Sequence, residues 1–90
     1  MIKVEFTPAL KRFFPDIQPQ EVEANTVAEV MQRLEDNYPG INTYLRDESG
    51  QLRKHINIFV DQELVRDRTQ LADELEGKRE ILIFQALSGG

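Results

Sequence analysis

The clearest helix of this 90-residue chain limits the fold more than any other feature. It begins after Thr26, a residue type that favours the N-cap, with Glu29 three residues later as a capping box requires. Pro39-Gly40 ends it. One stripe of residues at helical spacing predicts a single buried face: Val27, Val30, Met31, Leu34 and Tyr38. One helix cannot cover both faces of a sheet, so we expect a two-layer α+β domain.

Strand patterns occupy both ends of the chain. Apolar and polar residues alternate from the start, and the last apolar run has no polar face, as expected for a central strand. We predict strands at 1–7, 20–24, 56–60, 63–65 and 81–84. If the first and last strands are both central, they lie side by side in parallel. This arrangement is the ubiquitin-like β-grasp, a mixed sheet of about five strands packed on one main helix.

The remaining segments predict connections. Residues 41–46 are ambiguous and could form a short helical turn, whereas residues 47–50 form a polar loop. The stretch 66–79 is irregular, and we expect Leu71 and Leu75 to anchor it.

Composition excludes several classes of protein. Apolar residues make up 40% of the chain and charged residues 30%, the balance of one folded domain, which we place at residues 1–86. The formal net charge of −5 and the scattered cations argue against a nucleic-acid partner. The chain has no cysteine, which excludes disulfides and thiol chemistry. No stretch resembles a signal peptide or a membrane span, so we expect a cytoplasmic protein without a membrane partner.

Internal residues offer little catalytic chemistry. His55 is the only histidine, and no partner nucleophile accompanies it. The acidic pairs and clusters, at Glu21 and Glu23 and at residues 73–76, do not match the spacing of a calcium loop and are interpreted as solvated surface. We therefore predict neither a metal site nor enzymatic activity.

The last four residues form the unusual feature. Leu87, Ser88, Gly89 and Gly90 follow a central strand closely, and we interpret residues 87–90 as a flexible tail. Glycines without Cβ atoms permit close approach to a narrow active site. The Gly90 α-carboxylate has a reference pKa of about 3.5, so it is ionised at neutral pH and can attack a phosphate of ATP. The competing interpretation is a frayed end without function.

Two segments, residues 52–61 and 81–90, resemble the ThiS/MoaD family of sulfur carrier proteins. The terminal diglycine after a hydrophobic strand is the most specific part of the resemblance, which covers essentially the whole chain. It implies a carrier that binds no cofactor itself. A separate adenylating enzyme would use ATP to activate Gly90, a sulfur donor would convert it to a thiocarboxylate, and a biosynthetic enzyme would accept the sulfur.

A partner surface is expected on the sheet face away from the helix. If the alternate residues of the strands at 56–60 and 81–84 face the core, then Phe59, Leu82 and Phe84 project from the other side. Such an apolar patch suits docking. The alternative is a second small core beneath residues 66–75.

The chain departs from the family pattern at particular positions. Gln85 stands where many members carry proline, the turn at 61–62 lacks the glycine often found there, and residues 76–80 are longer and more basic than usual. Two other functions stay open. Gly90 could instead be joined to lysines of target proteins, as in a ubiquitin-like modifier, or the domain could be a plain interaction module.

Overall fold

The computed structural model describes residues 1–86, so the predicted tail at 87–90 lies outside the described residues. The elements follow one another in this order: β1 (Ile2–Phe6), the 3-10 helix η1 (Pro8–Arg12), β2 (Gln20–Val22), α1 (Val27–Asn37), α2 (Ile41–Leu45), β3 (Ile56–Val60), β4 (Glu63–Leu64) and β5 (Glu80–Gln85). Among these residues, no helix is both long and apolar enough to cross a bilayer.

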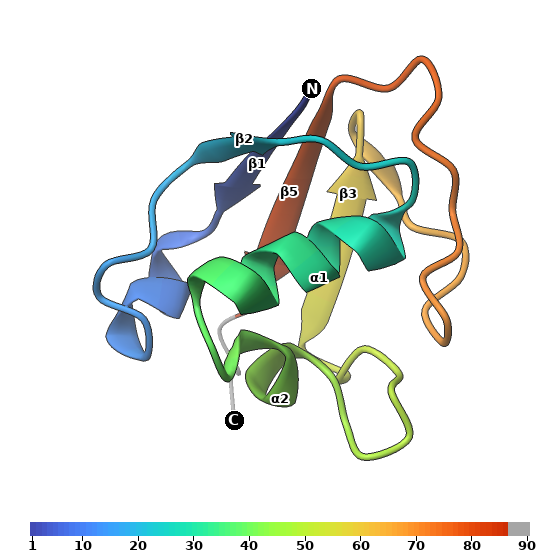
Figure 1. Cartoon of the computed structure of the whole chain (residues 1–90). Coiled ribbons are helices and arrows are strands. Elements are labelled where there is room, and N and C mark those ends of the chain that lie inside the picture. The colour runs from blue at the N-terminus through green and yellow to red at the C-terminus, as the bar shows by residue number, and fades with distance from the viewer. Residues whose placement is uncertain (87–90) are drawn as a thin grey trace.

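The five strands form one sheet in the order β2-β1-β5-β3-β4. The first and last strands, β1 and β5, are parallel neighbours, whereas β2, β3 and β4 pair antiparallel with their neighbours. β5 lies at the centre and α1 crosses one face of the sheet (Figure 1). The predicted β-grasp is therefore confirmed, including the parallel central pair.

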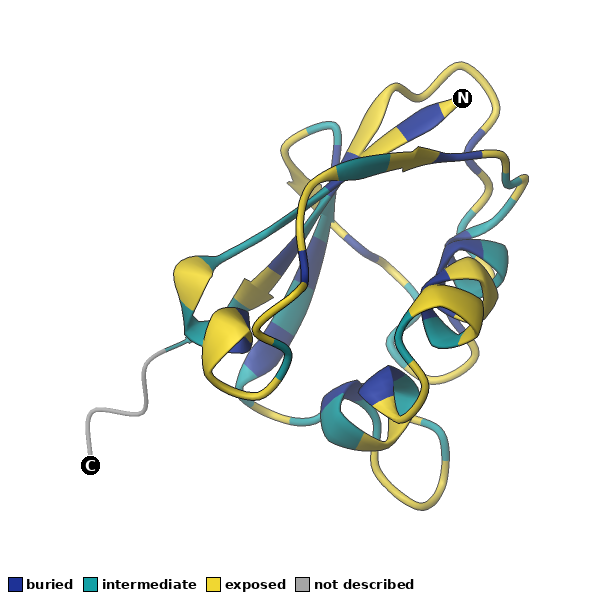
Figure 2. Cartoon of the chain, turned by 60° about the vertical axis from the view of Figure 1, so that its left-hand side comes forward, coloured by how far each residue is buried: buried dark blue, intermediate teal, exposed yellow. Residues whose placement is uncertain are grey.

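The core lies between the sheet and the two α-helices. Buried positions alternate along β3 and β5, so that every second side chain faces α1. Figure 2 shows buried segments on the sheet and on both helices where they face each other. The fully buried side chains include residues from all parts of the chain: Val4, Leu10, Met31, Leu34, Ile41, Ile58, Leu71 and Ile83.

The main helix is capped at its start as the sequence predicts, and its end is held by a contact that the sequence did not indicate. The Thr26 hydroxyl accepts a hydrogen bond from the Glu29 N–H at 3.2 Å. At the other end, the Glu35 carboxylate accepts the N–H groups of Gly40 and Asn42 at 2.7 and 3.0 Å. Gly40 has a φ of 97°, which glycine adopts without strain. These contacts resolve the ambiguous segment after Gly40 as the short helix α2.

Four strands differ in length from the prediction. β1 covers only Ile2–Phe6, because Thr7 is already the N-cap residue of η1. β2 ends at Val22, since the chain then leaves the sheet and the Asn25 carbonyl accepts the Leu75 N–H at 2.9 Å. β4 covers only Glu63 and Leu64. Val65 still donates its N–H to the Ile58 carbonyl at 2.8 Å, but the next N–H, that of Arg66, donates to the Asp73 carboxylate at 2.9 Å, so the chain leaves the sheet there. β5 gains one residue at each end, where contacts described below hold Glu80 and Gln85.

Candidate functional site

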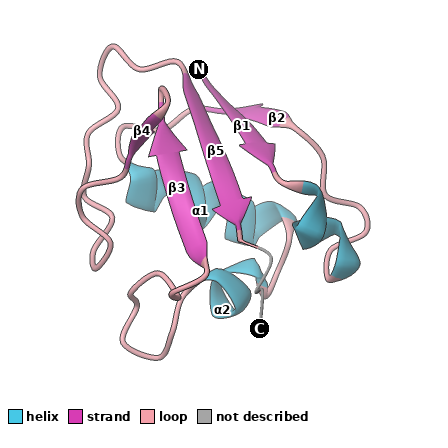
Figure 3. Ribbon diagram, turned by 180° about the vertical axis from the view of Figure 1, so that it is seen from behind, coloured by secondary structure: helices cyan, strands magenta, loops and turns pink. Residues whose placement is uncertain are grey.

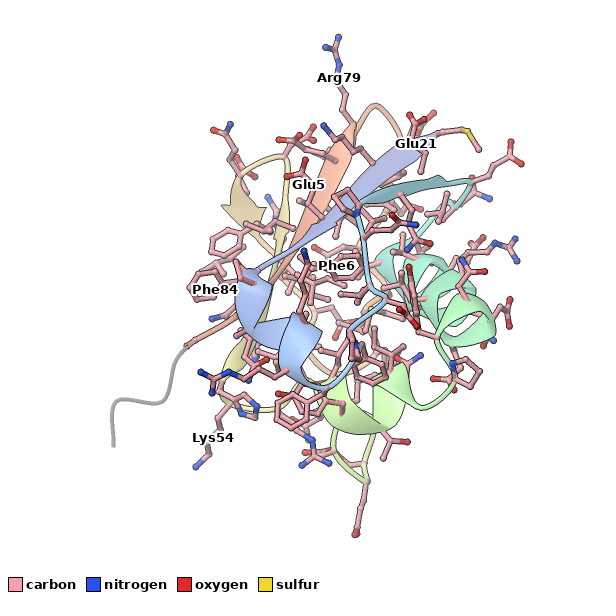
Figure 4. The ribbon with its side chains drawn as sticks, turned by 90° about the vertical axis from the view of Figure 1, so that its left-hand side faces the viewer. Glu5, Phe6, Glu21, Lys54, Arg79 and Phe84 are labelled. Atoms are coloured by element: carbon pink, nitrogen blue, oxygen red, sulfur yellow. The ribbon has the colours of Figure 1, made fainter. Side chains whose placement is uncertain are left out.

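Phe59, Leu82 and Phe84 lie together on the sheet face that points away from α1. Phe59 and Leu82 are direct cross-strand partners, and the rings of Phe59 and Phe84 meet edge to face with centroids 6.1 Å apart. Phe84 keeps 36% of its surface exposed and points away from α1 in Figure 4. We call this trio the outer apolar surface. A shallow groove borders it, with Glu5, Gln62 and Glu80 among its polar lining.

Sequence reasoning missed Leu64 as part of this face. Leu64 pairs directly with Phe59 across the β3–β4 hairpin, and partners in such a pair project from the same side of the sheet. Leu64 is 56% exposed, more than Phe84. The sequence feature that could have indicated Leu64 is the two-residue turn at 61–62. A turn of this length sets the register of the hairpin, so that Phe59 lies opposite Leu64.

The alternative of a second core beneath residues 66–75 is wrong. Leu71 and Leu75 are buried, but they belong to the single main core on the α1 side of the sheet. Seen from behind, the strands lie in front of the helices, and no helix or loop among residues 1–86 crosses the middle of β3 and β5 (Figure 3). The outer apolar surface is therefore open within the described part of the chain.

The base of the C-terminal segment is held from two sides. The Ala86 N–H donates to the His55 carbonyl at 2.8 Å, and the Gln85 N–H donates to Thr7 Oγ1 at 3.0 Å. The Thr7 N–H also donates to the Ile83 carbonyl at 3.1 Å. These bonds extend the sheet contacts of β5 to its end. The predicted site residues that follow, Leu87, Ser88, Gly89 and Gly90, lie outside the described residues.

Gln85 contributes a backbone hydrogen bond at the end of β5 that a proline could not. A proline at this position has no N–H and could not donate to Thr7. The side chain of Gln85 faces inward, opposite Ile56, and its Oε1 atom is buried without a hydrogen-bond partner among residues 1–86. The departure from the family pattern therefore adds a backbone hydrogen bond where the chain leaves the sheet.

The turn between β3 and β4 forms without glycine. Asp61 and Gln62 both have positive φ angles, 47° and 74°, as the tight hairpin turn requires. The Asp61 carboxylate accepts the N–H groups of Arg79 and Glu80 at 3.0 and 2.9 Å, which fastens the turn to the start of β5. These two hydrogen bonds hold the pKa of Asp61 below its ordinary value of 3.8. The bond from Glu80 has the larger effect and the bond from Arg79 the next largest.

The lowered pKa of Asp61 predicts that part of the free energy of unfolding depends on pH. Its pKa is lower in the folded chain than in the unfolded chain, so the ionised carboxylate stabilises the fold above pH 3.8. This contribution is lost as the pH falls through the folded-state pKa. We expect Asp61→Asn to lower the urea midpoint at neutral pH, and the difference from the parent to shrink in acid. Asp16→Asn, which removes another exposed carboxylate, is the control; an equal effect of Asp61→Asn at both pH values would contradict the prediction.

The other ionisable candidates do not assemble into a catalytic site. The His55 ring lies edge to face with Tyr44, with centroids 6.4 Å apart, and not beside a nucleophile. Residues 1–86 contain no group of three histidine or acidic side chains placed to hold a metal ion. The described residues instead offer an exposed apolar face and a strand end held by hydrogen bonds on two sides.

Comparison with known proteins agrees with this geometry. The profile of the ThiS family matches residues 9–90. The chain belongs to the ThiS family. The sulfur carrier protein CysO of Mycobacterium tuberculosis is 37% identical over 68 residues, which make up 73% of each chain. Membership of this family of small carrier proteins agrees with the prediction that the chain is not an enzyme.

Solved structures support the fold independently. A chain in the crystal structure of the Amycolatopsis orientalis BexX/CysO complex is 27% identical, with a TM-score of 0.80 and full coverage of both chains. SAMP1 from Haloferax volcanii gives a TM-score of 0.74 at 20% identity, covering 99% of this chain and 98% of its own, a likeness that shows the fold alone. The family and the β-grasp predicted from the sequence are both confirmed.

Proposed function

We propose that this ThiS family member is a sulfur carrier whose reactive group is the Gly90 carboxylate. In the first step a carboxylate oxygen attacks the α-phosphorus of ATP on a separate adenylating enzyme. Pyrophosphate leaves, and Gly90 is joined to AMP as a mixed anhydride. Hydrosulfide from a sulfur donor then attacks the carbonyl carbon, AMP leaves, and Gly90 ends as a thiocarboxylate. A biosynthetic enzyme accepts the sulfur and regenerates the carboxylate.

The observation that carries this proposal is the family match that runs through Gly90. The terminal diglycine is the part of the chain that fits a narrow active site, since it has no Cβ atoms. The relative from M. tuberculosis bears the name of a sulfur carrier, and we extend that role to this chain. The carrier itself binds no cofactor in this scheme, because ATP belongs to the adenylating enzyme. We place the reaction in the cytoplasm.

Residues 1–86 contribute a docking surface for the partner enzymes and fix the place where the C-terminal segment begins. The outer apolar surface of Phe59, Leu82 and Phe84 offers an exposed, preformed patch for the adenylating enzyme and for the sulfur acceptor. The N–H groups of Gln85 and Ala86 donate hydrogen bonds that hold the end of β5. The position of this strand end is therefore fixed relative to a partner that is bound to the outer apolar surface. Preorganisation of this kind lowers the entropic cost of binding.

Intact mass spectrometry tests the chemistry directly. The protein is incubated with ATP, a sulfide source and an adenylating enzyme from the same organism. We expect a mass gain equal to the replacement of one oxygen atom by sulfur, dependent on ATP. A variant that lacks Gly89 and Gly90 is the control, and it should show no gain.

The other outcomes identify the other functions. Lysine-linked adducts in place of the sulfur-dependent gain would assign the chain to the protein modifiers. If the parent protein gains no mass with an enzyme that is active on another carrier, the sulfur-carrier proposal is wrong and an interaction module remains.

A further inference from the structure

Basic side chains flank the point where the chain leaves the sheet. The base of the C-terminal segment is held by Thr7 on one side and by His55 on the other. Each of these residues adjoins an exposed cation. Arg12 on η1 lines a groove with Thr7, Phe84 and Gln85, and Lys54 directly precedes His55.

This placement runs against the charge of the chain as a whole. The formal net charge is −5, yet cations border the exit on both sides. The only ion pair among residues 1–86 joins Lys3 to Glu5, so neither Arg12 nor Lys54 is neutralised by a carboxylate of the described residues. Figure 4 shows Lys54 at the end of the molecule opposite Arg79 and Glu21. The two cations are thus exposed and available to a partner.

We propose that Arg12 and Lys54 form a basic collar that pairs with carboxylates around the entrance of the adenylating enzyme's active site. The inference rests on the proposed function, because it requires that Gly90 enter that active site. It adds a second contact, electrostatic in nature, to the apolar docking surface. Charges at the rim of an interface mainly raise the association rate.

The length of the segment after Ala86 determines which part of the partner complex the collar meets. Four residues span at most about 14 Å when fully extended. When Gly90 reaches the phosphates of ATP, the collar lies back by up to that distance, at the rim of the channel. If these four residues enter a narrow active site extended, the collar meets protein side chains at the rim rather than the nucleotide. The net charge of −5 disfavours nucleic acid as the alternative polyanion.

A matched pair of double variants tests the collar. Arg12→Gln with Lys54→Gln removes both collar charges, whereas Lys78→Gln with Arg79→Gln removes two charges at the opposite end of β5. Association of each full-length carrier with the adenylating enzyme is measured by stopped-flow fluorescence at low and high salt, without ATP. We expect the collar variant to associate roughly fivefold more slowly at low salt, with the difference disappearing at about 0.5 M salt. The control should change less than about twofold.

Adenylation of the parent protein is measured separately, so that failure of the proposed function is distinguished from failure of the collar. Equal slowing by both double variants would mean that only net charge matters, and it would overturn the collar. Unchanged association of the collar variant would also overturn it, even if Gly90 is adenylated normally. If the parent protein binds the enzyme but is never adenylated, the proposed function fails, and with it a collar that serves the entry of Gly90. Self-association of the parent that the collar variant lacks would assign the collar to a second copy of this chain and overturn the proposal.

Discussion

Replacing Phe84 by aspartate is expected to weaken binding to the adenylating enzyme by roughly a hundredfold, equivalent to about 2.7 kcal/mol. Phe84 contacts Phe59 edge to face and is the most exposed member of the outer apolar surface. Aromatic residues that become buried in an interface are among those that contribute most of its binding energy. The aspartate adds the cost of burying a charge that has no partner. Titration calorimetry with the adenylating enzyme measures the dissociation constant.

Thr43→Asp is the matched control for this experiment. It introduces the same charge at an exposed position of α2, which lies beside α1 on the other side of the sheet (Figure 1). We expect its dissociation constant to stay within about twofold of the parent value. Thermal unfolding of both variants tests whether the fold is retained. A folded Phe84→Asp variant with unchanged affinity would show that the partner docks elsewhere.

The fold was predictable because its main elements have unambiguous patterns. Most positions of β3 and β5 are apolar, and buried residues recur at every second position. Thr26 caps α1 as its sequence pattern indicates. A sheet with one covering helix and two central strands leaves few topologies. The bounds of β2 and β4 were less predictable because tertiary contacts end them. Val65 continues the strand pattern and faces the core beside Ile58, but the Asp73 carboxylate accepts the N–H of the next residue, Arg66, and the pairing with β3 ends there.

The candidate site was predictable only in part. Alternation along β3 and β5 indicated the outer face of Phe59, Leu82 and Phe84, and the structure places these three residues together. The contribution of Leu64 required the cross-strand register, which no single segment reveals. The contacts of Thr7 with Ile83 and Gln85 join residues 76 and 78 positions apart, a separation that local patterns do not address.

The positive φ angles at Asp61 and Gln62 show why a family pattern is not a strict requirement. Glycine favours this hairpin turn because it adopts positive φ without strain. Here the Asp61 carboxylate accepts the N–H of Glu80, the first residue of β5, and that of the preceding Arg79, which offsets the conformational cost. The departure therefore changes how the turn is stabilised and leaves the register of β3 and β4 intact.

Truncating Ile83 to alanine is expected to destabilise the domain by about 3 kcal/mol. Ile83 is fully buried on β5, opposite Ile58 on one side and beside Phe6 on the other. The loss removes three buried carbon atoms and leaves a cavity that a small core cannot fill. Since domains of this size have total stabilities of about 5–10 kcal/mol, the melting temperature should fall by about 15 °C. Calorimetry or circular dichroism measures the shift.

Leu82→Ala supplies the comparison, since Leu82 adjoins Ile83 on the same strand and points to the opposite face. We expect it to cost less than about 1 kcal/mol, because the outer face is open among residues 1–86 and leaves no closed cavity. The same variant should weaken partner binding, whereas Ile83→Ala should do so only through loss of folded protein. Equal destabilisation by the two variants would mean that the outer face is packed in the free carrier. That result would contradict its assignment as a docking surface.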